Sequence, residues 1–183
     1  MYASWMDEAG IEARGLAPLK PYLDRINAVT DKAGLLALMS TIDFAAPFGV
    51  GIEADPDDPT RYAVWVAQGG IGMPDRDYYL KSGASFEKYR AAYKTYVTKI
   101  FELRGDPAPA KSADAVIALE KKIAQGHWSQ EALRVPEKAF NTMSYAELKT
   151  FAPAVNWDGV MSGMGLPATP AKMVLYGDTA VRD

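Results

Sequence analysis

Two short segments with alternating apolar residues most constrain the fold of this chain. Residues 48–55 read FGVGIEAD and residues 61–68 read RYAVWVAQ, and in both the bulky apolar side chains recur at every second position. This period of two is typical of a strand that buries one face. The prolines and aspartates between the two segments favour a turn. The pattern therefore predicts a β-hairpin, with Val64 and Val66 facing the core and Trp65 on the opposite face.

The hairpin continues into residues 69–80, GGIGMPDRDYYL, a segment dense in turn-forming and charged residues. Its glycines permit a sharp change of direction, and Pro74 suits the first turn of a following helix. We expect Arg76 to pair with flanking carboxylates or to cap carbonyl groups. We expect Tyr78 and Tyr79 to anchor the segment in a helical core. The segment is therefore predicted to be a strand-to-helix corner, with no cluster of convergent polar groups that would indicate a ligand site.

Helical periodicity dominates the rest of the chain. Apolar residues recur at intervals of three and four in residues 4–16, 18–29 and 31–46, which predicts three amphipathic helices before the hairpin. After the corner, residues 86–105 predict a long helix that ends at Gly105, a residue suited to a C-terminal cap. We expect its apolar stripe to belong to the core. The members of this stripe are Phe86, Tyr89, Tyr93, Tyr96, Ile100 and Leu103.

Three further elements are predicted towards the C-terminus. A helix is expected to start at a Ser112 cap, and Ser144 and Glu147 have the spacing of a capping box that starts another. Residues 172–177, KMVLYG, form a short strand candidate whose pairing partner the sequence does not identify. We therefore expect one mainly α-helical domain over residues 1–183, with one hairpin and a short C-terminal strand. The residues of the Ser112 helix expected to face inward are Val116, Leu119, Ile123 and Trp128.

Composition and motifs exclude several function classes. The formal net charge of −3, with basic residues scattered among acidic ones, disfavours a nucleic-acid partner. The chain has one histidine, His127, and no cysteine, so it cannot supply the usual ligands of a zinc site, and we expect His127 to be structural or solvated. The GGIG run lacks the further residues of a nucleotide-binding loop. Asp55, Asp57 and Asp58 lack the spacing of a calcium loop and are interpreted as a solvated turn.

Six stretches in chain order carry the most specific pattern in the sequence. They are YASWMD (2–7), IEARGLAPLKPYLDRI (11–26), the segment from Phe48 to Leu80, ALEKKIA (118–124), EKAFNTMSYAEL (137–148) and VNWDGVM (155–161). Together they resemble consecutive signature stretches of the neprilysin family of zinc metalloendopeptidases, which includes the endothelin-converting enzymes and bacterial oligopeptidases. The resemblance covers essentially the whole chain. It departs from the family pattern at Val135, where an aspartate is usual.

This resemblance implies that the chain is a portion of a larger enzyme. Family members are similar in having a thermolysin-like catalytic domain with His-Glu-x-x-His and a downstream Glu-x-x-x-Asp, closed over by a largely helical second domain. In that mechanism zinc acts as a Lewis acid and activates water, and a glutamate acts as general base. The chain resembles the N-terminal part, which builds most of the helical domain. The resemblance thus implies zinc in the parent enzyme, none in this chain, no catalytic residue here, and a polypeptide that continues at both ends.

On this interpretation the chain encloses substrate and selects it by size. Its partners are the catalytic domain of the same polypeptide and peptide substrates, and the parent is expected to be exported, periplasmic or extracellular. Separated from that domain, the chain is expected to self-associate through its terminal strand candidate. The alternative is a free-standing helical protein-binding module, which a downstream His-Glu-x-x-His would exclude. The residues of the family motif, for which a structural role is preferred, are Gly70, Gly72, Pro74, Asp75, Arg76, Asp77, Tyr78 and Tyr79.

Overall fold

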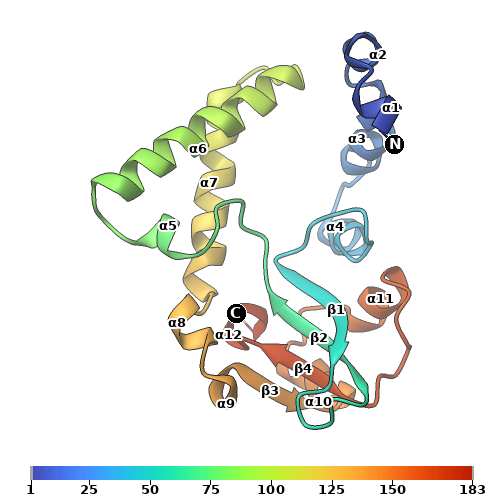
Figure 1. Ribbon diagram of the computed structural model, residues 1–183. Coiled ribbons are helices and arrows are strands. Elements are labelled where there is room, and N and C mark those ends of the chain that lie inside the picture. The colour runs from blue at the N-terminus through green and yellow to red at the C-terminus, as the bar shows by residue number, and fades with distance from the viewer. Residues whose placement is uncertain (1, 183) are drawn as a thin grey trace.

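The computed structural model describes residues 2–182, and Met1 and Asp183 lie outside the described residues. Figure 1 shows a small sheet at the base, a long helical hairpin on one side, and a series of short helices on the other side. The mainly helical fold class is confirmed. The sheet is larger than the single hairpin and C-terminal strand that the sequence predicts.

The sheet contains four strands in the order β1-β2-β4-β3. The predicted hairpin is confirmed as β1 (Phe48–Ala54) and β2 (Tyr62–Gln68), which pair antiparallel. β4 (Met173–Tyr176) lies parallel to β2, and β3 (Phe140–Met143) is antiparallel to β4. The sequence pattern did not predict β3, which is only four residues long.

The predicted C-terminal strand is confirmed as β4, and the structure supplies the pairing partners that the sequence did not identify. Its residues pair with β2 on one side and β3 on the other, and Met173, Val174 and Leu175 are fully buried. Since both edges of β4 are already hydrogen-bonded, this strand offers no free edge for pairing between copies.

The predicted register of the hairpin is confirmed by the burial of its side chains. Val64 and Val66 are 4% and 0% exposed and belong to the main core, whereas Trp65 lies on the other face of the sheet. There the Trp65 ring packs edge-on against Phe140 at 5.0 Å and near Tyr176 at 6.4 Å between ring centroids. The alternation of a strand thus places the valines and the tryptophan in two different environments.

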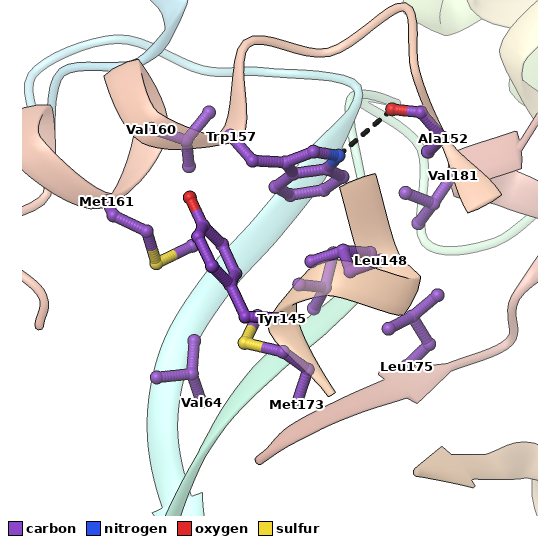
Figure 2. Close-up of a cluster of buried hydrophobic side chains, with 11 residues drawn as sticks. Val64, Tyr145, Leu148, Ala152, Trp157, Val160, Met161, Met173, Leu175 and Val181 are labelled. Carbon is purple, nitrogen blue, oxygen red and sulfur yellow. Dashed lines mark hydrogen bonds between the residues drawn. The ribbon is translucent and has the colours of Figure 1, made fainter. Parts of the chain in front are cut away.

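Three helices supply the other half of the main core. They are α10 (Tyr145–Phe151), α11 (Trp157–Gly163) and α12 (Thr179–Arg182). Figure 2 shows their side chains meeting those of β2 and β4, with the indole of Trp157 donating a hydrogen bond to the Ala152 carbonyl at 3.0 Å. α10 begins at the predicted capping box, in which the backbone N–H of Glu147 donates to Ser144 and the backbone N–H of Ser144 donates to Glu147.

A helical hairpin extends from the corner that follows β2. Its members are α5 (Asp77–Leu80), α6 (Ala84–Leu103) and α7 (Pro109–Gly126), and an ion pair of 2.5 Å joins Lys94 of α6 to Asp114 of α7. α6 ends at the predicted position, with Gly105 at a φ of +79°. α7 starts at Pro109 instead of a Ser112 cap, and the Ser112 hydroxyl donates to Asp106 at 3.1 Å.

The expected core role of the apolar stripe on α6 is wrong. Phe86 and Tyr93 are half-buried, and the other four members of the stripe are exposed. On α7, Leu119 is also exposed, at 59%, instead of facing inward. Val97 is the buried residue of α6, so this helix packs on α7 through a face beside the stripe.

The N-terminal helices pack loosely on the rest of the described chain. None of their described residues is buried, and α4 approaches α11 where the Ser40 carbonyl lies against Gly163. The three predicted helical segments are present as shorter pieces. They are α1 (Tyr2–Trp5), α2 (Glu8–Arg14), the 3₁₀ turn η1 (Ala17–Leu19), α3 (Lys20–Asn27) and α4 (Lys32–Met39). Two further short helices, α8 (Gln130–Leu133) and α9 (Pro136–Ala139), connect α7 to β3.

The hairpin turn is not simply solvated, contrary to our interpretation of its aspartates. Asp55 is buried, and its carboxylate accepts a hydrogen bond of 2.5 Å from the Lys172 ammonium, which also contacts Asp57. The hydrogen bond from Lys172 lowers the pKa of Asp55, with a further contribution from the backbone N–H of Asp57. The turn is therefore fastened to the chain just before β4.

Candidate functional site

Two glycines constrain the corner between β2 and α5. Gly70 has a φ of +78°, and a Cβ placed on it would lie 2.7 Å from the Cα of Pro47. A Cβ on Gly72 would lie 2.0 Å from the hydroxyl oxygen of Tyr93. Glycine at these positions therefore permits a backbone conformation and a close approach that other residues would disturb.

A carboxylate on α7 receives hydrogen bonds from three other parts of the chain. Glu120 accepts from Tyr93 at 2.9 Å, from Tyr79 at 3.1 Å and from the Gly72 backbone N–H at 3.0 Å. The Tyr79 hydroxyl oxygen in turn accepts from the backbone N–H of Met73 at 2.9 Å. Burial raises the pKa of Tyr79 to about 12, and the Glu120 charge acts in the same direction. We call the set of Gly72, Tyr79, Tyr93 and Glu120 the Glu120 network.

The corner also contacts the C-terminal end of α7. His127 is 3% exposed, and its Nε2 donates to the Gly69 carbonyl at 3.0 Å. This bond fixes the tautomer, because a carbonyl oxygen can only accept. The Arg76 guanidinium donates to the backbone carbonyl of His127. The two interactions join the corner to the last turn of α7, where cations are also favoured by the helix dipole.

Gln68 extends this junction towards the C-terminus. Its side-chain amide accepts from the Trp128 backbone N–H at 2.7 Å and donates to the Trp128 carbonyl at 3.2 Å. The Trp128 indole donates to the Thr179 hydroxyl at 2.9 Å. A single glutamine at the end of a strand gives no sequence signal for such a role. Neither Gln68 nor Glu120 was singled out from the sequence.

The remaining residues of the family motif support the corner locally. The Asp75 carboxylate accepts from the Asp77 backbone N–H at 2.8 Å, and Asp77 forms a 2.7 Å ion pair with Lys81. The Tyr78 ring packs edge-on against an aromatic ring of α6 at 5.7 Å. Pro74 lies three positions before Asp77, the first residue of α5, so it does not occupy the first turn of the helix as expected.

A hollow of about 340 Å³ lies beside the corner. Its lining combines polar and apolar groups, including Gln68, Met73, Asp75, His127 and Leu133. The polar groups of Gln68, Asp75 and His127 are already hydrogen-bonded to neighbouring backbone groups. The hollow is therefore suited to an apolar side chain more than to a charged ligand.

The described residues do not fit a zinc site. Within residues 2–182, no group of three or more His, Cys, Asp or Glu side chains could hold a metal ion. A zinc site requires three or four such ligands, and the Nε2 atom of His127 is already bonded to the Gly69 carbonyl. In the same range, no helix has the length and hydrophobicity needed to cross a bilayer.

Comparison with known proteins gives the family. The family model described as peptidase family M13, for its N-terminal region, matches residues 1–183. The chain belongs to this family. It is 28% identical over 168 residues to endothelin-converting enzyme 1 of Cavia porcellus and, at the same identity and length, to that of Homo sapiens. The match covers 85% of this chain and 22% of either relative, so the chain spans about a fifth of the length of these relatives.

Solved structures of longer chains resemble most or nearly all of the described fold. The zinc metalloprotease Zmp1 of Mycobacterium tuberculosis in complex with an inhibitor is 30% identical, with a TM-score of 0.88 over 98% of this chain and 28% of that chain. The open state of the same enzyme gives a TM-score of 0.85. PepO of Lactobacillus rhamnosis is 17% identical with a TM-score of 0.74 over 90% of this chain and 27% of that chain, a likeness of fold alone.

The buried His127 of this M13 chain predicts a loss of stability in mild acid. Burial lowers the pKa of His127 below its usual value, and the nearby Arg76 charge acts in the same direction. The unfolded chain therefore takes up a proton first, near pH 6.5, and stability falls as the pH drops below that value. The uptake of one proton lowers the free energy of unfolding by at most about 1.4 kcal/mol for each pH unit. Urea unfolding at intervals from pH 7.5 to 5.5 measures this slope.

The matched variant is His127→Gln, whose amide can still donate to the Gly69 carbonyl but does not titrate. Its free energy of unfolding should change little over the same pH range. Measurement stops at pH 5.5 because carboxylates with lowered pKa values, such as that of Asp55, contribute below that range. Equal slopes in the two proteins would contradict the assignment to His127.

Proposed function

We propose that this chain is part of the helical domain that encloses the substrate cavity of an M13 peptidase and limits the size of the peptides that enter. The observation that carries the proposal is the match to the family over residues 1–183, together with the set of structures of one relative. The Mycobacterium tuberculosis enzyme is described in an open state, a partial open state and an inhibitor complex. We infer from these states that parts of such an enzyme move relative to one another.

The contacts at the corner indicate which roles its residues have in this function. We propose that the family-motif residues are structural, because the polar groups of Asp75, Arg76, Asp77 and Tyr79 are hydrogen-bonded or ion-paired within the chain, including the Asp75 carboxylate beside the hollow. The Glu120 network holds the corner against both α6 and α7, so it keeps the helical hairpin at a fixed angle to the sheet. The chain itself supplies enclosure, and peptide hydrolysis belongs to the rest of the polypeptide.

The partners and cofactor of the whole protein follow from the same proposal. They are a catalytic domain in the same polypeptide, peptide substrates, and a zinc ion whose ligands lie outside this chain. Export of the whole protein stays a prediction, which fractionation of cells would check.

We also propose that the isolated chain self-associates through the exposed apolar residues of its N-terminal helices, since β4 has no free edge. Light scattering over a concentration series measures this association.

The proposal predicts that loosening the corner widens substrate selection. In the longer polypeptide, Glu120→Ala removes an acceptor of three hydrogen bonds, and bonds to a charged group each contribute about 1.5–3 kcal/mol. We expect the ratio of kcat/KM for a peptide of about 40 residues to that for a hexapeptide to rise severalfold, because enclosure excludes long peptides sterically. The hexapeptide kcat/KM should change little.

The matched control is Lys122→Ala, also on α7 but at an exposed position. It should leave the ratio unchanged. The 183-residue chain alone should hydrolyse neither peptide, which tests the assignment of catalysis to the rest of the polypeptide. An equal fall in kcat/KM for both peptides in the Glu120→Ala variant would argue against a role in size selection.

A further inference from the structure

The apolar stripe on α6 has the spacing of a coiled-coil seam. Its residues follow one another at alternating intervals of three and four, which is the a and d pattern of a heptad repeat. This pattern extends over almost the whole helix. The stripe consists of Phe86, Tyr89, Tyr93, Tyr96, Ile100 and Leu103. A seam of this kind packs against another α-helix by inserting its side chains between those of the partner.

No described helix occupies the C-terminal half of this seam. Tyr96, Ile100 and Leu103 are 61%, 47% and 59% exposed. α7 packs on a neighbouring face, where Val97 is buried and Lys94 pairs with Asp114. Figure 1 shows the C-terminal end of α6 at the top of the view, far from the sheet. We call Tyr96, Ile100 and Leu103 the open seam.

The N-terminal half of the stripe is partly covered. The Tyr78 ring of α5 packs against Phe86 and Tyr89, with ring centroids at 5.7 and 5.4 Å. Tyr93 reaches α7 through its hydrogen bond to Glu120. One continuous stripe is therefore used within the described chain at one end and exposed at the other. Contiguous exposed apolar residues of this kind mark interaction surfaces.

The charges beside the seam select among partners. The positions that flank a and d residues are occupied by Arg90, Lys99 and Arg104 and by uncharged residues, with no acidic side chain among them. Arg90 donates to the Tyr78 and Lys81 carbonyls, and Arg104 pairs with Asp106, whose side chain is only 10% exposed. Lys99 pairs with Glu102, but both side chains are substantially exposed, so this pair holds the Lys99 ammonium weakly. Flanking charges set partner choice in helix pairs. A second copy of α6 would bring like charges together, whereas a helix with acidic flanks would be attracted.

We propose that the open seam of α6 is covered by an amphipathic helix with acidic flanks from the rest of the same polypeptide. This inference rests on the proposed function, because the chain spans about a fifth of the length of its relatives. A helix in the same polypeptide also has a high effective concentration, which favours a seam of modest hydrophobicity over a separate partner. Packing of this helix on the open seam would connect the helical hairpin of α6 and α7 to a segment that is distant in sequence.

Thiol accessibility tests this proposal directly, since the 183-residue chain contains no cysteine. Tyr96→Cys places a thiol in the open seam, and Lys88→Cys places a control thiol on an exposed position of the same helix. Maleimide labelling is followed at each site by mass spectrometry, in the 183-residue chain and in the longer polypeptide. We expect Cys labelling at position 96 to be at least about tenfold slower in the longer polypeptide, as a protected site requires. Labelling at position 88 should be equal in both.

A charge reversal tests the acidic flanks. Lys99→Glu, combined with Tyr96→Cys in the longer polypeptide, should restore part of the labelling rate, because the covering helix would then be repelled. Lys88→Glu combined with Tyr96→Cys is the control and should leave the rate slow. Circular dichroism of each variant must match that of the parent, so that a faster rate reports the loss of the covering helix and not unfolding.

Three results would overturn the proposal. Equal labelling at position 96 in the two polypeptides means that the seam stays open. Slow labelling in the 183-residue chain that depends on its concentration means that a second copy is the occupant. No effect of Lys99→Glu means that the covering segment does not carry acidic flanks. The labelling rates do not depend on peptide cleavage, so failure of the size-selection experiment and failure of this one are separate outcomes.

Discussion

The variant Trp157→Ala should lose about 3–5 kcal/mol of its free energy of unfolding, the cost typical of removing a buried tryptophan. Trp157 is 1% exposed and is the largest fully buried side chain in the described chain. Its ring packs on Phe48 at 5.3 Å, and its indole donates to the Ala152 carbonyl (Figure 2). Removing the ring leaves a cavity and deletes a buried hydrogen bond to the Ala152 carbonyl, and both effects destabilise the fold. Urea denaturation at pH 7 measures the loss.

The matched control is Trp5→Ala in α1, where the ring is 78% exposed. The same change of side chain should alter stability by no more than about 0.5 kcal/mol, as is usual for surface positions. Equal losses in the two variants would show that the core shown in Figure 2 does not carry the stability of the chain. A large loss in Trp5→Ala alone would show that α1 is covered in solution.

Elements that depend on neighbouring residues could be predicted from the sequence. The hairpin follows from strict alternation, and α10 follows from the spacing of Ser144 and Glu147. The end of α6 follows from a glycine with a positive φ. In each case the residues that determine the structure lie within a few positions of one another.

The arrangement of the sheet could not be predicted in this way. β4 pairs with β2 through Val64 and Met173, residues that lie far apart in the sequence. A strand of four residues carries too little pattern to identify such a partner, and β3 was too short to be recognised at all. The inner position of β4 therefore depends on tertiary pairing, and the local pattern indicates only that the segment is extended.

The stripe on α6 shows a different limit. Periodicity identifies an apolar face but not the element that covers it, so a core role was assigned to residues that are exposed in the described chain.

The corner shows a third limit. Its glycines signal a close approach, but the partner is Glu120, one of several charged residues on α7, and nothing in its local sequence distinguishes it.

The variant Gly70→Ala should lose roughly 2–5 kcal/mol of its free energy of unfolding, from two physical causes. A residue with a Cβ in the left-handed region costs about 1–2 kcal/mol. The added Cβ would also lie 2.7 Å from the Cα of Pro47 and 3.0 Å from the Ala46 carbonyl oxygen, and backbone cannot move aside as a flexible side chain does. Overpacking of this kind adds about 1–3 kcal/mol. Urea denaturation measures the sum.

The variant Gly105→Ala separates the two causes. Gly105 has a φ of +79°, almost equal to the +78° of Gly70, but nothing lies within 4 Å of a Cβ built on it. Its loss should be only about 1 kcal/mol, because the left-handed conformation is the remaining cost and the unfolded chain also loses some freedom. The difference between the two variants measures how closely the corner packs on the segment before β1. Equal losses would mean that the corner can shift away from Pro47, and then the Glu120 network could not hold it at a fixed position.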